Sequence, residues 1–241
     1  MSGARIRGDT LEQGQRLRQR RAAETRIFMN NLNDIALNEI AELQDRLTAR
    51  WHAEAFETWR WPEQRFMALV ARQHLANFEL WHSEDEARAP GATDTDLARV
   101  KRRIDETNQK RNDLAEQIDH ALLDMLAAQG LPNELAALHS ESPGLMIDRL
   151  SILALKIFHT REEMERRDAP EGHAERNGER MAILTTQRAD LAACLATLWD
   201  EVLAGTRRFK VYRQLKMYND PTLNPAIYGK SGGRSGAGKI K

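Results

Sequence analysis

Apolar residues recur at steps of three and four through most of the chain, which is the period of an amphipathic α-helix. In the first predicted helix, over 25–50, the stripe consists of Phe28, Leu32, Ala36, Ile40, Leu43 and Leu47. The same period predicts further helices over about 62–88, 93–129, 143–167, 174–203 and 209–217. The pattern therefore predicts an all-α protein.

Proline, glycine and short polar residues punctuate this pattern where helices are expected to begin and end. Thr93 and Asp96 have the spacing of a capping box, and Ser142-Pro143 places a cap before proline at the first helical position. Gly130 and Gly205 follow the last periodic residues of two helices, where glycine commonly ends a helix. These signals predict short connections between consecutive helices.

The chain also matches itself at an offset of 77 residues. The segment around His82 corresponds to the segment around His159, and each histidine has an acidic residue three positions on. Residues 111–114 correspond in the same way to 188–191. The two matches predict a helical bundle built from two duplicated long helical hairpins, together with an N-terminal helix and a short C-terminal helix.

Composition and charge predict a globular body between two basic ends. Hydrophobic residues make up 41% of the 241 residues, which is enough for a core. Seven arginines among residues 1–26 and four basic residues among 229–241 leave the body acidic, because the net charge is zero. We expect a basic, flexible tail over 1–24, one all-α domain over 25–228 and a Gly/Lys-rich disordered tail over 229–241.

Cysteine content and hydropathy predict a cytoplasmic protein without a transmembrane segment. Cys194 is the single cysteine, so no internal disulfide forms, and a reducing compartment is its natural setting. The arginine-rich start lacks the apolar core of a secretory signal, and the most apolar run, 150–158, is too short to cross a membrane. The basic tails suit an anionic membrane surface, but without aromatics for base stacking they give no strong nucleic-acid signal.

Carboxylates flank the apolar stripes of the second and third predicted helices. Glu116 and Asp119 are one turn apart, so both can face one ion, and Glu84 and Asp85 on the preceding helix can complete a four-carboxylate cluster. Such oxygen ligands suit Mg²⁺ or Mn²⁺, and all-α nucleotide pyrophosphohydrolases space carboxylates in this way. Salt bridges across the bundle are the alternative, so both interpretations stay open.

The fourth predicted helix is apolar nearly all round, yet it carries Arg149 and Lys156 two turns apart on one face. They can bind a phosphate or carboxylate, or pair with acids of neighbouring helices. His82 and His159 precede acids by three residues, the reverse of the Glu-x-x-His order of bundle di-metal sites, so a hydrogen-bonded histidine pair is the simpler interpretation. The predicted ligand-binding residues are His82, Asn108, Arg111, Asp148, Arg149, Lys156, His159 and Arg188.

Four segments together resemble one bacterial family. They are Trp81-His82-x-Glu84-Asp85, Arg103-Ile104-Asp105-x-x-Asn108-x-x-Arg111, Ser142-Pro143 with Asp148-Arg149-Leu150-Ser151-Ile152-Leu153-Ala154-Leu155-Lys156-Ile157, and Lys216-Met217-Tyr218-Asn219-Asp220-Pro221-x-Leu223-Asn224-Pro225. Taken together they are similar to the domain-of-unknown-function family numbered 4254, over roughly residues 64–228. The resemblance implies no reaction. It implies a setting near the glycosyltransferases of surface-polysaccharide synthesis, where members of the family tend to be encoded.

These observations leave two classes of function open. The first is a protein of bacterial surface-polysaccharide metabolism that binds or processes a phosphorylated sugar or nucleotide in a polar bundle interior, with Mg²⁺ or Mn²⁺ as the candidate cofactor. The second is a non-catalytic scaffold with a glycosyltransferase partner. The first requires the polar residues above to face one common space, and the second requires an exposed apolar patch. The sequence does not decide whether the protein is an enzyme.

Overall fold

The fold is all-α, as predicted. The computed structural model describes residues 37–55 and 58–215. The elements, in chain order, are η1 (Leu37–Glu39), α2 (Ile40–Ala53), α3 (Arg65–Ala87), α4 (Asp94–Ala127), β1 (Ala137–Leu138), α5 (Pro143–Glu165), α6 (His173–Leu203) and β2 (Arg207–Arg208). The two strands form only a short parallel bridge between one pair of two-residue segments. All of these elements belong to a compact unit that ends at Val211, and a second unit begins at Tyr212.

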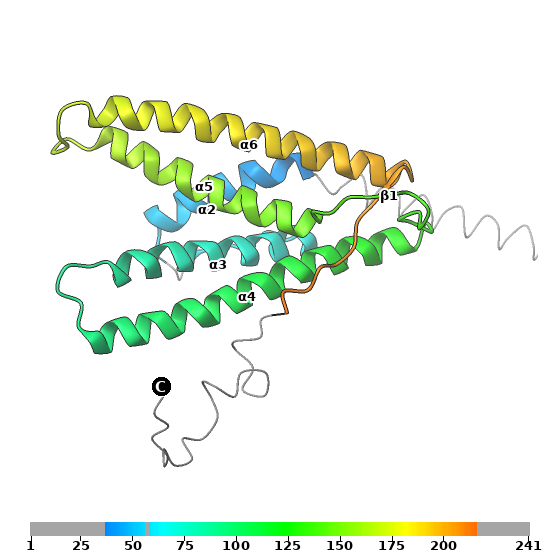
Figure 1. The fold of residues 1–241 in the computed structure, drawn as a ribbon, viewed down its shortest axis with the longest axis horizontal. Helices are drawn as coiled ribbons and strands as arrows, with labels where there is room; N and C mark the ends of the chain where they lie inside the picture. The colour runs from blue at the N-terminus through cyan, green and yellow to red at the C-terminus, as the bar shows by residue number, and fades with distance from the viewer. Residues whose placement is uncertain (1–36, 56–57, 216–241) are drawn as a thin grey trace, which may run out of the picture. The chain divides into compact units, whose positions relative to one another are not determined.

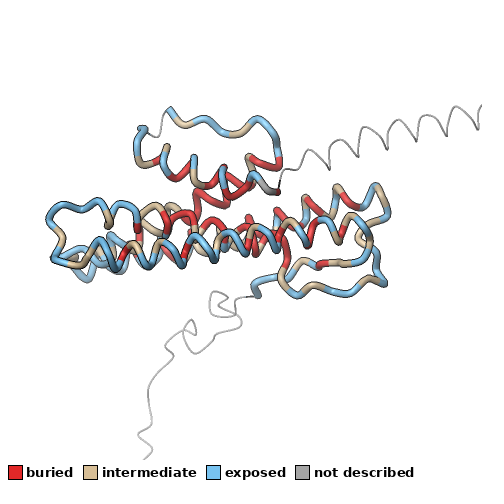
Figure 2. The backbone as a smooth tube through the Cα atoms, turned by 90° about the horizontal axis from the view of Figure 1, so that it is seen from above, coloured by how far each residue is buried: buried red, intermediate tan, exposed pale blue. Residues whose placement is uncertain are grey.

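The long helices form two antiparallel hairpins, α3 with α4 and α5 with α6 (Figure 1). Helix α5 is central, because it packs against α2, α3 and α4 as well as α6. Its position explains why the sequence of α5 is apolar nearly all round. Helix α2 lies on one side of the hairpins and contacts α3 and α5 (Figure 2). The two predicted hairpins are present, and the superposition of one on the other stays a prediction.

Buried positions follow the inner faces of these helices (Figure 2). The apolar core joins residues of all the long helices, among them Ile40, Val70, Ile118, Ile147 and Leu195, each with no exposed surface. Burial of these side chains supplies the main stabilisation of the bundle. Among the described residues, six polar side chains also have no exposed surface: Gln44, Thr48, Gln73, His74, Ser142 and Ser151. Five of them belong to α2, α3 and α5, and Ser142 caps the start of α5.

The predicted caps are confirmed. Thr93 and Asp96 form a capping box at the start of α4, and the Ser142 side chain caps α5 ahead of Pro143. The start of α5 lies unusually close to α4: a Cβ atom on Gly144 would be 2.2 Å from the Ala115 carbonyl oxygen. Only glycine fits this contact without a shift of the backbone.

Two helix predictions need correction. The predicted helix over 209–217 is wrong in its described part, because residues 209–215 are not helical. After α6 the chain turns at Gly205 (φ 69°), and Arg207 and Arg208 pair with β1. Phe209 directly after them is buried, and the described chain beyond it has no regular structure. The second helix begins at Arg65, three residues after Pro62.

The first predicted helix is described only from Leu37, and it ends at Ala53 and not at Arg50. Its predicted part over 25–36 and both predicted basic tails lie outside the described residues. Among the residues that the structure describes, none of the helices combines the length and the apolar composition that a membrane crossing requires.

Candidate metal centre

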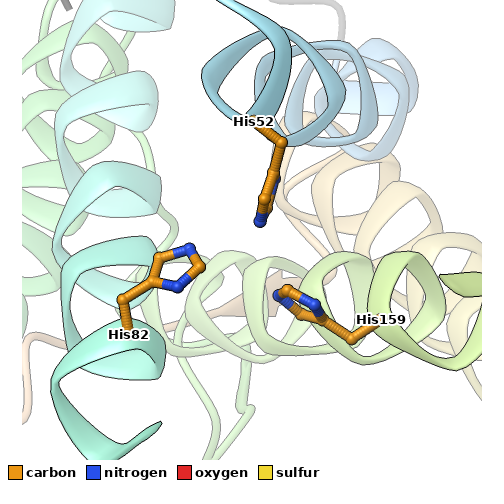
Figure 3. Close-up of side chains that lie close together, drawn as sticks. All are labelled: His52, His82 and His159. Atoms are coloured by element: carbon orange, nitrogen blue, oxygen red, sulfur yellow. The ribbon is translucent and has the colours of Figure 1, made fainter. Parts of the chain in front are cut away.

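Three histidines from three helices converge in the bundle. His52 lies in the last turn of α2, His82 near the end of α3, and His159 in the second half of α5. Their rings point toward a shared space (Figure 3), and one ring nitrogen of each lies within 4.8 Å of the other two. All three side chains are half-buried. In the described part of the chain, they are the group of histidine, cysteine or acidic side chains that is arranged to hold an ion.

Hydrogen bonds fix the protons on two of the three rings. The Nδ1 atom of His52 lies 2.8 Å from the Thr48 carbonyl oxygen, which only accepts, so Nδ1 carries the hydrogen and Nε2 keeps its lone pair. The Nδ1 atom of His159 lies 2.7 Å from the Glu162 carboxylate and donates to it in the same way. Both Nε2 atoms are buried, and neither has a hydrogen-bond partner among the described residues.

This pattern is the one that metal-binding histidines show. A ligating imidazole donates its other N–H to a carbonyl or carboxylate, which fixes the tautomer and the orientation of the ring. Zinc–nitrogen bonds of about 2.0–2.1 Å place tetrahedral ligands roughly 3.4 Å apart. A bound ion would therefore draw these nitrogens together by about 1 Å or a little more from their present limit of 4.8 Å.

An aromatic shell holds the three rings in place. Phe158 stacks on His52 with ring centroids 4.2 Å apart, and Trp81 stacks on His159 at 4.6 Å with an interplanar angle of 6°. Phe78 meets His52 and His82 edge-on, at 4.9 Å and 4.5 Å. The Nε2 atoms of His52 and His159 are themselves buried, so their lone pairs lie where an unpaired polar atom is costly.

Burial also favours the neutral, ligand-competent form of two of the histidines. It lowers the pKa of His82, and the nearby His52 and His159 lower it further. Burial likewise lowers the pKa of His159, although the Glu162 carboxylate opposes the shift. Both rings therefore stay unprotonated somewhat below the pH at which a free histidine takes up a proton.

A second histidine lies two turns earlier on α3 and is fully satisfied. Thr48 donates its hydroxyl proton to the Gln44 carbonyl, so Thr48 accepts from Nε2–H of His74 at 2.9 Å. The other ring nitrogen, Nδ1, then accepts from the Ser151 hydroxyl at 2.7 Å. Asn77 donates to that hydroxyl oxygen and to Asp148. Burial lowers the pKa of His74 to about 3, so this ring stays neutral.

The structure does not bring the four predicted metal-binding carboxylates together. Glu84 is paired with Arg88 at 2.8 Å, and Asp85 is exposed. Since Glu86 pairs with Arg103, the end of α3 lies level with that part of α4. Glu116 follows about 13 residues later, roughly 20 Å along the helix axis. The antiparallel direction of the hairpin therefore separates Glu84 and Asp85 from Glu116 and Asp119.

Asp119 has a structural role at the start of α5. Its carboxylate accepts a hydrogen bond from the Gly144 amide at 2.7 Å, and Ser142 also donates to it. Burial raises the pKa of Asp119 to about 6, against the opposing effect of these two hydrogen bonds. The side chain joins α4 to the N-terminus of α5 at the site where Gly144 permits close approach.

The remaining predicted ligand residues are divided among separate places. Arg111 lies 3.7 Å from Asp148, whose carboxyl also accepts from Gln73 and Asn77, and burial raises the pKa of Asp148. Arg149 is exposed and pairs with Glu141 at 2.8 Å. The other three are Asn108, half-buried on α4; Lys156, exposed on α5; and Arg188, paired with Asp45 at 2.6 Å. The expected single polar interior is thus several distinct polar contacts.

Comparison with known families gives one match. Residues 67–211 match the family described as protein of unknown function (DUF4254). The chain belongs to this family. The family predicted from the four segments is confirmed, and DUF4254 carries no assigned activity. Comparison with curated proteins and with solved structures finds no match.

The matched range contains His82 and His159 but not His52. Sequence reasoning selected the first two because they correspond at the offset of 77 residues. It missed His52, which it placed in a connector after the first helix. Nothing in the local pattern around His52 links it to the other two, since the contact depends on how α2 crosses α3 and α5.

Proposed function

We propose that this protein binds a divalent transition-metal ion through His52, His82 and His159. The observation that carries the proposal is the pair of buried, unpartnered Nε2 lone pairs on His52 and His159, which face a common space with His82. A buried acceptor without a partner costs about 1–3 kcal/mol. A metal ion bound by these nitrogens removes that cost.

The donor set decides which ions fit. Imidazole nitrogen suits zinc, copper, nickel and iron, whereas Mg²⁺ and Ca²⁺ prefer oxygen ligands. Zinc is the first candidate, because it accepts nitrogen ligands and imposes no geometry of its own. The Mg²⁺ or Mn²⁺ expected from the sequence would need the carboxylate cluster, and those carboxylates lie apart.

Three protein ligands leave one position of a tetrahedral ion open to water or to a ligand. Structural zinc sites are usually closed by four protein ligands, whereas catalytic sites keep such a position. The proposed site is therefore of the catalytic type, with an open coordination position, and not a structural zinc site. An ion in this position supplies Lewis-acid chemistry, by polarising a bound oxygen or acidifying a bound water.

A cobalt titration tests this proposal. The protein is purified without a histidine tag, stripped of metal with a chelator, desalted and titrated with Co²⁺, whose visible absorption reports the coordination, and Zn²⁺ is then added in competition. We expect one Co²⁺ per chain, displaced by Zn²⁺. His52→Gln, His82→Gln and His159→Gln should each lose the signal.

The matched control is His120→Gln, because His120 is an exposed histidine on α4. It should bind cobalt as the unsubstituted protein does. Circular dichroism confirms that each variant is folded. Absence of a stoichiometric signal, or equal loss in the His120 variant, would show that the three histidines only pack against their aromatic neighbours.

A phosphorylated sugar or nucleotide as the ligand, and a glycosyltransferase as the partner, are expectations of the sequence that stay proposals. A three-histidine centre is compatible with the first of these, because its open position accepts oxygen ligands of an anion. The scaffold alternative does not need the three histidines at all. If a cell that lacks the protein shows a phenotype, the same phenotype in a cell with a folded His159→Gln variant would therefore favour the metal-dependent activity.

A further inference from the structure

A cavity of about 400 Å³ lies between α5 and α6, next to the three histidines. Its lining includes Trp81, Lys156, His159, Asn177, Arg180 and Leu184. His159 and Trp81, which stack on each other, form the wall that the cavity shares with the candidate metal centre. A molecule in this cavity therefore lies against the ring that the proposed ion binds.

Two cationic side chains line the cavity, Lys156 from α5 and Arg180 from α6, and both residues are exposed. Arg180 donates one hydrogen bond to the Asn177 side-chain oxygen at 2.9 Å, which orients the guanidinium and leaves its other N–H groups for a ligand. Within the described part of the chain, Lys156 forms no ion pair with an acidic residue.

The acid of this cavity does not neutralise these two charges. Glu163 is already paired, with His173 at 2.8 Å and with Arg166 at 2.9 Å. Asn177 is buried, and its amide donates to the His173 carbonyl, so its contribution is to hold Arg180. The cavity thus presents a net positive charge, which favours a ligand with an anionic group.

Two of the lining residues supply apolar surface. Trp81 and Leu184 offer surfaces that suit the carbon skeleton of an organic molecule. The volume exceeds that needed for an inorganic ion alone. Charge at one place and apolar surface at another are the usual elements of a site for a small organic anion.

We propose that this cavity binds an organic oxyanion, a phosphate monoester or a carboxylate, whose charged group is held by Lys156 and Arg180 beside the metal centre. The proposal rests on the proposed metal-binding function, because the ion supplies a further positive charge at the shared wall. Ion and anion should therefore strengthen each other's binding, and reciprocally so.

Calorimetry with three probes of one skeleton tests it: phenyl phosphate, benzoate and the neutral phenol. Each is titrated into zinc-loaded protein and into desalted, metal-free protein. Phenyl phosphate or benzoate should bind the zinc-loaded protein, phenol should not, and zinc should raise the affinity at least about fivefold. The two anionic probes distinguish a phosphate site from a carboxylate site.

Substitutions identify the cavity. Lys156→Met and Arg180→Met should each weaken binding about tenfold or more, since each removes a charged hydrogen-bond donor. Arg149→Met is the matched control, because Arg149 is already paired with Glu141 and lines a neighbouring cavity of about 690 Å³. It should leave the affinity unchanged. Lys156 lines both cavities, so the loss in the Arg180 variant, together with an unchanged Arg149 variant, is what identifies the cavity beside His159.

The outcomes separate this proposal from the one on which it rests. Cobalt binding without affinity for either anion overturns the anion site and keeps the metal centre. Equal affinity with and without zinc, or an Arg149 variant as weak as the Arg180 variant, also overturns it. Absence of cobalt binding overturns the metal centre itself, and with it an anion held beside an ion.

Discussion

Helices α2, α3 and α5 meet at two levels, here called layers, and the histidines of the two layers differ in their hydrogen bonding. The first layer takes Thr48 from α2, His74 from α3 and Ser151 from α5. The second takes His52, His82 and His159, which lie four, eight and eight residues farther along the same helices. In both layers the α3 and α5 residues are 77 positions apart.

The difference lies in where the lone pairs and protons go. In the first layer both ring nitrogens of His74 have partners, so these hydrogen bonds fix the register of three helices and leave no imidazole lone pair for a metal ion. In the second layer, His52 and His159 occupy the positions that Thr48 and Ser151 hold in the first. The Nε2 atoms of these two histidines have no hydrogen-bond partner among the described residues. Burial of a histidine therefore does not itself indicate a site. What distinguishes the second layer is two buried ring nitrogens without partners that face a third histidine ring.

The largest expected effect is the stabilisation of the second layer by an ion. Zinc at about 100 times its dissociation constant should add roughly 2.7 kcal/mol to the free energy of unfolding, or about 5–10 °C in midpoint. Thermal unfolding with zinc and after metal removal measures it. His159→Gln should abolish the shift and Ser151→Ala should retain it. Equal loss in both variants would erase the distinction between the layers.

A smaller effect should follow from Glu162→Gln. Glu162 accepts from Nδ1–H of His159 and so sets which nitrogen faces the ion. Loss of such an outer partner typically weakens metal binding by about 10–100-fold. Competition between Co²⁺ and a chelator measures the affinity. Glu165→Gln, an exposed acid near the end of the same helix, is the control. An unchanged affinity in the Glu162 variant would mean that the ring needs no carboxylate to hold its tautomer.

The first layer should respond in stability and not in metal binding. Ser151→Ala removes the partner of Nδ1 of His74 and one partner of Asn77, so we expect a loss of about 1–3 kcal/mol. Urea unfolding of metal-free protein measures it, and Ser140→Ala, at an exposed serine, is the control. A weaker cobalt affinity in the Ser151 variant would contradict the separation of the layers.

The last prediction concerns pH. Because burial lowers the pKa of His74 to about 3 from 6.5, the unfolded chain takes up a proton in this window and the folded protein does not. Stability should therefore fall as pH falls below 6.5, by about 1.4 kcal/mol per pH unit from this group. The difference in unfolding free energy between His74→Gln and the unsubstituted protein, measured at pH 5 and pH 7, isolates it.

Asp119 changes the free energy of unfolding with pH in the opposite direction. Its raised folded pKa of about 6 means that the folded protein binds the proton more readily, so its contribution falls as pH rises from 3.8 toward 6. This contribution is common to both proteins in the comparison and cancels. A His74→Gln difference that does not change with pH would show that the His74 ring is not kept neutral by burial.

Local pattern was sufficient to predict much of this protein. The 3.6-residue period predicted the all-α class and the long helices, and short polar residues predicted the starts of α4 and α5 at Thr93 and Ser142. Both signals act within one or two turns, where backbone hydrogen bonds and caps are decided. The offset of 77 residues also identified His82 and His159 as equivalent positions in the sequence.

Tertiary structure alone decided the sites. The antiparallel run of α3 and α4 separated carboxylates that the helical period had placed on suitable faces. Residues 209–215, which follow the pairing of β2 with β1, do not form the predicted helix. The crossing of α2 over α3 and α5 brought His52 to the other two histidines and Thr48 to His74. The physical reason is that helix formation depends on neighbours four residues away in the chain. A site depends on which helices pack together and on how they are aligned along their axes.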